Sequence, residues 1–298
     1  MASDGCGNLF ERVDGATQFE RLARVAHVAA CRAVPTYRTQ KSRHDFTQPQ
    51  LLAILVLQKS FDMTYRQVTE MLRAMPGVRE VLGLASVPHW TTLHKFATRR
   101  CNIELINDIL ARLARDMIEA DGGGRREVAM DSTGIDSSTA SRYYRGRTGQ
   151  NKARYVKTSL ACVVGLLVPC VVMCGWGPTL DRDDAIELAS RAVMAVPTSC
   201  ILADKGYDLE ALHVLMRERH GVDTKVPPIP RKGVVKSRYR STLTGQIEGY
   251  GRRWHVETVM SILKGRTGEA TRAHGQTRPL TDAALKVLAT AMIIAPPQ

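Results

Sequence analysis

Two aspartates stand directly after apolar runs that are predicted to be buried strands. Asp131 follows Val128-Ala129-Met130, and Asp204 follows the run 200–203. Because α/β folds build sites at the carboxyl ends of sheet strands, these carboxylates are expected at such an end, or on the strand itself. Adjacent carboxylates repel unless cations lie between them, and Mg²⁺ or Mn²⁺ prefers oxygen ligands and suits phosphate chemistry. The alternative for each aspartate is a turn or a helix cap.

A third carboxylate lies on a predicted helix at 250–264. Tyr250, Arg253, Glu257 and Lys264 follow one another at offsets of three, seven and fourteen residues from the tyrosine. At helical geometry their side chains fall within about 60° of one another. The carboxylate could complete a metal site, and the two cations could hold phosphates. The alternative is a surface ion pair of Arg253 with Glu257 at spacing four. Trp254, beside this face, is more typical of a core residue than of one that stacks on a base.

The charge balance points to a polyanionic partner. Lys and Arg total 42 against 29 Asp and Glu, for a net charge of +13, and nucleic acid fits such an excess. Two basic stretches contain no acid and suit a phosphate backbone, with tyrosines in the first that could stack on unpaired bases. The first comprises Arg142, Arg145, Arg147, Lys152, Arg154 and Lys157, and the second comprises Arg231, Lys232, Lys236, Arg238 and Arg240. The alternative is a pair of solvated loops.

The elements that would position these groups form two predicted domains. Residues 1–124 are expected to be all helical, with helices near 19–31, from about 91, and at 104–120. Capping boxes at Thr47-x-x-Gln50 and Thr64-x-x-Gln67 predict two more helix starts. The run 51–57 is apolar on all sides and predicts a buried helix. Pro76-Gly77 is expected to end the helix that starts after Thr64. A short glycine-rich linker at 121–124 closes this region.

Residues 125–298 are predicted to form an α/β domain, a mixed sheet flanked by helices. Expected strands lie at 128–130, 155–165, 168–175, 200–203 and 222–226, and expected helices at 183–194, after Asp208, at 250–264 and at 282–294. The apolar stretch 160–177 is long enough to resemble a membrane span. Gly165 and Pro169 interrupt it, so two buried strands joined by a turn are expected instead.

Cysteine usage and the N-terminus predict a cytoplasmic protein. The seven cysteines are odd in number and form no CxxC pair, which argues against a disulfide framework or a zinc site. Reduced thiols are therefore expected. Residues 1–12 contain two acids and no apolar run of signal-peptide length. A wholly disordered chain is excluded because 44% of the residues are hydrophobic.

Three segments resemble the DDE transposases of bacterial insertion sequences, of the insertion sequence 4 and insertion sequence 5 kind. Tyr250-x2-Arg253-x3-Glu257-x6-Lys264 is similar to their Tyr–Arg–Glu–Lys signature at every spacing. The stretch 203–208, Ala-Asp-Lys-Gly-Tyr-Asp, resembles the segment around their second catalytic aspartate, and 130–133, Met-Asp-Ser-Thr, resembles the first. The resemblance runs from about Val128 to the end of the chain, and less specifically through the N-terminal helices.

This resemblance implies a ribonuclease-H-like catalytic domain after an all-helical N-terminal domain that could bind DNA ends. Asp131, Asp204 and Glu257 would be the catalytic triad and would hold two Mg²⁺ ions, for which Mn²⁺ could substitute. Tyr250, Arg253 and Lys264 would bind DNA phosphates. Further DNA contacts are expected from the first basic stretch, at Arg145, Arg147, Lys152, Arg154 and Lys157.

The implied activity is transposition: binding of element ends, strand cleavage, and joining of 3′ ends to target DNA by two-metal phosphoryl transfer. Double-stranded DNA would be the partner, a homodimer on DNA the active form, and the nucleoid in the cytoplasm the location, without a membrane. The short segment 230–249 lacks the β insertion that some relatives carry, so the handling of the cleaved end stays open. Two alternatives stay open as well, namely a transposase-derived DNA-binding protein without catalysis and a metal-dependent nuclease of the same fold.

Overall fold

A five-stranded mixed sheet forms the centre of the molecule, for which a computed structural model describes residues 15–41, 43–137, 154–229 and 237–295. The strands are β1 (Arg126–Asp136), β2 (Tyr155–Val163), β3 (Val168–Trp176), β4 (Thr198–Ala203) and β5 (Asp223–Lys225). They lie in the order β3-β2-β1-β4-β5. The pairs β1–β2 and β2–β3 are antiparallel, whereas β1–β4 and β4–β5 are parallel. The predicted mixed sheet flanked by helices is confirmed.

The apolar stretch at 160–177 is a β-hairpin. Every residue of β2 after Tyr155 is buried, as are the first five residues of β3. Gly165 and Leu167 have positive φ in the turn between the two strands, which suits glycine and strains leucine. Burial on both faces explains the continuous apolar pattern. Within the described ranges, no helix is long and apolar enough to cross a membrane.

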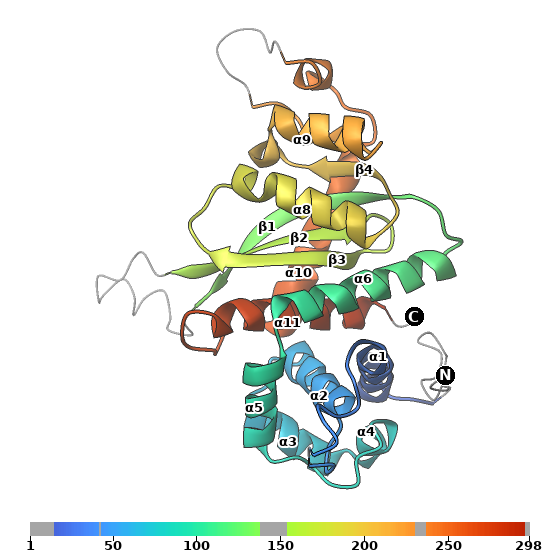
Figure 1. Cartoon of the computed structure of the whole chain (residues 1–298), viewed down its shortest axis with the longest axis vertical. Coiled ribbons are helices and arrows are strands. Elements are labelled where there is room, and N and C mark those ends of the chain that lie inside the picture. The colour runs from blue at the N-terminus through green and yellow to red at the C-terminus, as the bar shows by residue number, and fades with distance from the viewer. Residues whose placement is uncertain (1–14, 42, 138–153, 230–236, 296–298) are drawn as a thin grey trace.

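Helices cover both faces of the sheet (Figure 1). In that view α8 (Asp181–Ala195) lies in front of the strands and α10 (Trp254–Thr267) behind them. The helices α6 (Ile103–Ala120) and α11 (Arg278–Ile294) pack against β3. A short helix α9 (Glu210–Val214) continues as a π-helical turn at Leu215–Arg219. Three 3₁₀ turns complete this part, at Lys205–Tyr207, Arg240–Leu243 and Tyr250–Arg253.

The N-terminal helical region consists of α1 (Gln18–Ala33), α2 (Gln48–Ser60), α3 (Tyr65–Ala74), α4 (Pro76–Val81) and α5 (Trp90–Arg100), followed by α6. Both predicted capping boxes are present, with Thr47 and Thr64 accepting from the backbone N–H of the glutamine three residues on. Residues 51–57 are fully buried, because α2 packs against α1 and α11. One continuous apolar core therefore joins this region to the sheet.

The helix α3 ends at Ala74, just before Pro76-Gly77 as predicted, and Pro76 also starts α4, where its missing N–H costs nothing. Three local predictions differ from the structure. The strand β1 runs on to Asp136 because residues 131–136 pair with β2. Asp208 does not cap a helix, since its carboxylate pairs with Arg240 at 2.5 Å and accepts the N–H of Ile229. The helix expected from Tyr250 begins as a 3₁₀ turn and becomes α-helical at Trp254.

Candidate active site

Asp131 and Asp204 lie side by side at the point where the parallel pairing of β1 and β4 ends. The last paired residues are Met130 and Ala203, so the two aspartates are the next pair in register. Neighbouring strands are about 4.8 Å apart, which brings their first side chains beyond the pairing close together. Asp204 follows β4 directly, as expected, while Asp131 lies within the longer strand β1. The sheet thus joins two carboxylates that are distant in the sequence.

Backbone hydrogen bonds orient both carboxylates. The N–H of Ser132 donates to Asp131 Oδ1 at 2.7 Å, and the N–H of Gly206 donates to Asp204 Oδ1 at 2.8 Å. Burial raises the pKa of Asp131, and the charge of Asp204 acts in the same direction, while the Ser132 N–H opposes it. This pair of acids therefore favours a compensating cation.

Arg253 connects the third acid to this pair. Its guanidinium donates to Glu257 one turn along the chain, and its Nη1 lies 3.5 Å from Asp131 Oδ2. The spacing-four ion pair anticipated as an alternative is thus present, but the same arginine also reaches the strand acid. Within the described ranges, no three His, Cys, Asp or Glu side chains lie close enough to hold a metal ion. Arg253 thus bridges Glu257 and Asp131.

Tyr250 faces the same cluster, and Lys264 lies further along α10. The Tyr250 ring centroid is 6.0 Å from the Arg253 guanidinium. Burial raises the pKa of Tyr250, and the charge of Asp204 acts in the same direction, which places the ring beside the acids. Lys264 is two turns beyond Glu257, about 10 Å along the helix axis. It is partly exposed, and no carboxylate in the described ranges is in ion-pair distance of it.

A second layer of charged groups supports the aspartates and was not predicted from the sequence. Asp181, in the first turn of α8, accepts from Ser132 Oγ at 2.6 Å. Its Oδ1 is 3.1 Å from Lys157 Nζ, which is also 2.8 Å from Asp184 Oδ2. The only sequence signal was the group of acids at 181–184, which is also typical of an ordinary helix start.

Lys157 does not lie on a surface that DNA could touch. Its side chain is 5% exposed, and its ammonium group is enclosed by Asp181, Asp184 and the carbonyl of Leu180. This corrects its expected role as a phosphate contact, because lysine 157 points from β2 toward α8 rather than into solvent. Arg154 is exposed and lies 5.4 Å over the ring of Trp176.

Two further expectations concern residues near the site. Arg145, Arg147 and Lys152 lie outside the described residues. Trp254 was expected in the core, and that prediction was wrong: its side chain is 54% exposed and stacks on His255 with centroids 4.2 Å apart.

Comparison with known families identifies the class of this site. The family model of the Transposase DDE domain matches residues 122–292, more than half of the chain, and the chain belongs to that family. A comparison with curated proteins gave no match. Membership confirms the ribonuclease-H-like fold expected from the resemblance. It also means that the protein is a nucleic-acid-processing enzyme of the transposase class, with DNA as its partner. Enzymes of this family generally use divalent metal ions.

Proposed function

We propose that this chain is a transposase of the insertion sequence 4 and insertion sequence 5 kind. It would bind the ends of its element, cleave DNA strands and join the 3′ ends to target DNA by two-metal phosphoryl transfer. One observation supports this most directly: Arg253 contacts both Asp131 and Glu257, and Asp131 is next in register to Asp204. The three motif segments thereby meet at one edge of β1, as a shared reaction centre requires.

The donor set fits divalent ions in part. Asp131 and Asp204 offer hard oxygen ligands, and the burial that raises the pKa of Asp131 would favour a compensating cation beside it. Glu257 completes the set only when Arg253 releases it. When bound, divalent ions would supply charge neutralisation at the phosphate and a lowered pKa for the attacking hydroxyl.

Arg253 offers a physical route to that release. A guanidinium binds a phosphate as well as it binds a carboxylate, with two parallel hydrogen bonds. A DNA phosphate entering beside Tyr250 would take over the donors that now serve Glu257. The freed carboxylate would then turn toward Asp131 and Asp204. In this proposal substrate binding assembles the metal site, and Lys264 holds a second phosphate along α10.

The remaining roles are proposals of the same kind. Residues 1–124 would form a domain that binds the element ends, and residues 125–298 would form the catalytic domain. Arg145, Arg147, Lys152 and Arg154 would contact the DNA backbone. The active form would be a homodimer on double-stranded DNA, acting on the nucleoid in the cytoplasm.

A cleavage and strand-transfer assay tests this function. The substrate is a plasmid that carries the inverted repeats flanking the coding region, incubated with the protein and Mg²⁺. Asp204→Ala should abolish cleavage while end binding stays within about twofold, because one ligand is lost and no DNA contact is. Asp183→Ala is the matched control, since Asp183 is an exposed acid in the first turn of α8. Unchanged cleavage by Asp204→Ala would refute the proposed site, and cleavage without joining of pre-cleaved ends would identify a nuclease instead.

A further inference from the structure

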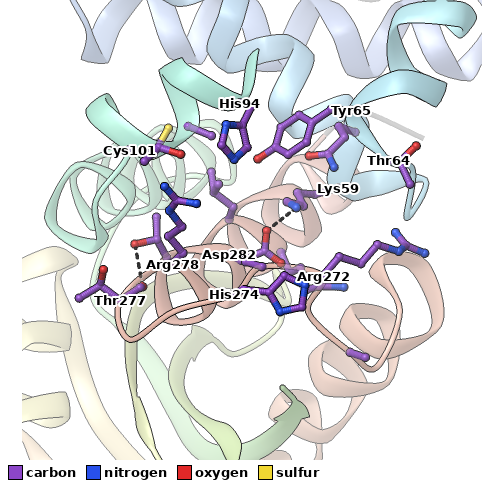
Figure 2. Close-up of a pocket in the computed structure, with 18 of the residues that line it drawn as sticks. Lys59, Thr64, Tyr65, His94, Cys101, Arg272, His274, Thr277, Arg278 and Asp282 are labelled. Atoms are coloured by element: carbon purple, nitrogen blue, oxygen red, sulfur yellow. Dashed lines mark hydrogen bonds and ion pairs between the residues drawn. The ribbon is translucent and has the colours of Figure 1, made fainter. Parts of the chain in front are cut away.

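A cavity of about 460 Å³ lies between the N-terminal helices and the C-terminal part of the chain (Figure 2). Its walls come from α2, α3, α5, α11 and the loop at 270–277. None of Asp131, Asp204, Arg253 and Glu257 is among the residues that line it, so it is separate from the candidate active site. Its volume is that of a small-molecule site and is far too small for a duplex.

The cavity carries an excess of positive charge. Lys59, Lys286, Arg272 and Arg278 line it together with the two acids Asp62 and Asp282. Both acids are already engaged. Asp282 pairs with Lys59 at 2.5 Å, and the two carboxylate oxygens of Asp62 accept from Arg272 at 2.9 and 3.0 Å.

Arg278 is the cation left for a ligand. It is exposed, and no carboxylate in the part of the chain that the structure describes is in ion-pair distance of it. Its charge nevertheless acts on Tyr65, opposing the rise in that residue's pKa that burial causes. Arg278 therefore lies close to the tyrosine, and Figure 2 shows both side chains on the walls of the same cavity. An anionic group could bind there.

Gln58, one of the residues that line the cavity, carries a buried polar atom without a partner. Gln58 is 4% exposed, and its Nε2 donates to the carbonyl of Met63 at 2.7 Å. That bond fixes the amide orientation, so the acceptor Oε1 faces away from Met63 and has no hydrogen-bond partner within the described residues. A buried acceptor of this kind costs free energy unless a donor reaches it. The N–H groups of a nucleobase are such donors.

Aromatic rings complete the wall beside these groups. Tyr65 and His94 meet edge to face with centroids 5.6 Å apart, and both line the cavity next to Ala97, Cys101 and Leu285. Flat rings and small apolar groups suit a base, as aromatic platforms do in single-strand binding. The cavity thus combines an unpaired guanidinium and an aromatic wall with a lining residue whose buried acceptor is unsatisfied.

We propose that this cavity binds a single nucleotide, with its phosphate on Arg278 and its base against Tyr65 and His94 near Gln58. A nucleotide carries both an anionic phosphate and a flat base, and DNA, the partner of this family, consists of nucleotides. The nucleotide comes either from an unpaired position of a DNA strand or from the free mononucleotide pool. This site is additional to the proposed metal site and does not depend on cleavage.

Fluorescence titration of the full chain with 2-aminopurine probes tests the proposal. The chain carries Asp204→Ala, so that DNA stays intact and failure of cleavage leaves the readout unaffected. The probes are 2-aminopurine deoxyribonucleoside monophosphate, a short duplex with one unpaired 2-aminopurine, and the same duplex fully paired. Arg278→Ala should weaken binding about tenfold, the usual effect of one lost charge-assisted hydrogen bond. Arg32→Ala, which removes the same charge outside the cavity, should leave binding unchanged.

The titrations with the monophosphate and with the duplexes distinguish a free nucleotide from a nucleotide of a DNA strand. Arg278-dependent binding of the monophosphate supports a free nucleotide, and Arg278-dependent preference for the unpaired over the paired duplex supports a DNA nucleotide. Equal affinities of Arg278→Ala and Arg32→Ala for every probe would overturn the proposal. A second variant, Gln58→Leu, should weaken binding of the base while thermal unfolding shows that the chain still folds. If Gln58→Leu unfolds, the comparison of Arg278→Ala with Arg32→Ala still tests the proposal, because Arg278 is exposed.

Discussion

Replacing Lys157 with methionine separates its two assigned roles, a buried ion pair and a DNA phosphate contact. The ammonium group lies 2.8 Å from Asp184 Oδ2 and 3.1 Å from Asp181 Oδ1, and the side chain is 5% exposed. Removing one partner of a buried ion pair costs about 3–5 kcal/mol. The two aspartates are 24 and 31% exposed, so water partly solvates the charges left behind. We therefore expect a loss of about 3 kcal/mol in the free energy of unfolding, at the lower end of that range.

The measurement is a pair of urea unfolding curves, with DNA binding followed as a function of salt. A change in the urea midpoint at constant slope reports the stability loss. The double variant Lys157→Met/Asp184→Asn is the control and should recover part of the loss, because one stranded charge is removed with its partner. The slope of log affinity against log salt should not change. A buried lysine makes no phosphate contact, whereas each lost contact reduces the slope by about 0.9. Unaltered stability with a reduced salt slope would show that Lys157 faces DNA and that the structural assignment is wrong.

Two more predictions concern metal binding and pH. Without DNA, Arg253→Ala should bind Mn²⁺ more tightly than the wild type, because Glu257 and Asp131 lose a competing cation. The same variant should cleave DNA at least about tenfold more slowly. Calorimetry measures Mn²⁺ binding, with Arg252→Ala as the control, and weaker Mn²⁺ binding by Arg253→Ala would contradict the prediction. Burial lowers the pKa of Lys286 from 10.5 to about 8. Between those pH values the unfolded chain holds a proton that the folded chain has released, so stability should rise with pH. Lys286→Met should lack that rise in unfolding curves, and an identical pH profile would refute the assignment.

Local signals in the sequence were sufficient for the helix starts and the buried strands. The capping boxes at Thr47 and Thr64 depend on residues within one turn, so no tertiary information is needed to predict them. The hairpin at 155–176 could be predicted because strands buried on both faces are continuously apolar. The polar half of β1 could not, since residues 131–136 are held in the sheet by their pairing with β2, which is distant in the sequence, and by a bridge from Asp136 to Ala270.

Side-chain direction was the main limit at the candidate site. Lys157 and Arg154 are in the same basic stretch, yet one is buried against α8 and the other is exposed over Trp176. The charge of a basic residue does not indicate which face of a strand it occupies, because an acid on another element can pair with it on the buried face. Asp181 was missed for the same reason, because its link to Asp131 runs through Ser132 and becomes visible only when α8 is placed on the sheet.

The end of β4 explains why Asp131 and Asp204 lie together at one edge of the sheet. β1 continues to Asp136 with β2 on one side, whereas β4 ends at Ala203 and turns away into the 3₁₀ helix at 205–207. Within the residues that the structure describes, the second edge of β1 therefore has no parallel neighbour beyond Met130 until the bridge from Asp136 to Ala270. Asp131 is the first residue after the pairing ends, and Arg253 reaches it there from the start of α10. A strand that extends beyond its neighbour thus brings Asp131, Asp204 and Arg253 to one edge of the sheet. Under the proposed function, a phosphate held by Arg253 would meet both aspartates there.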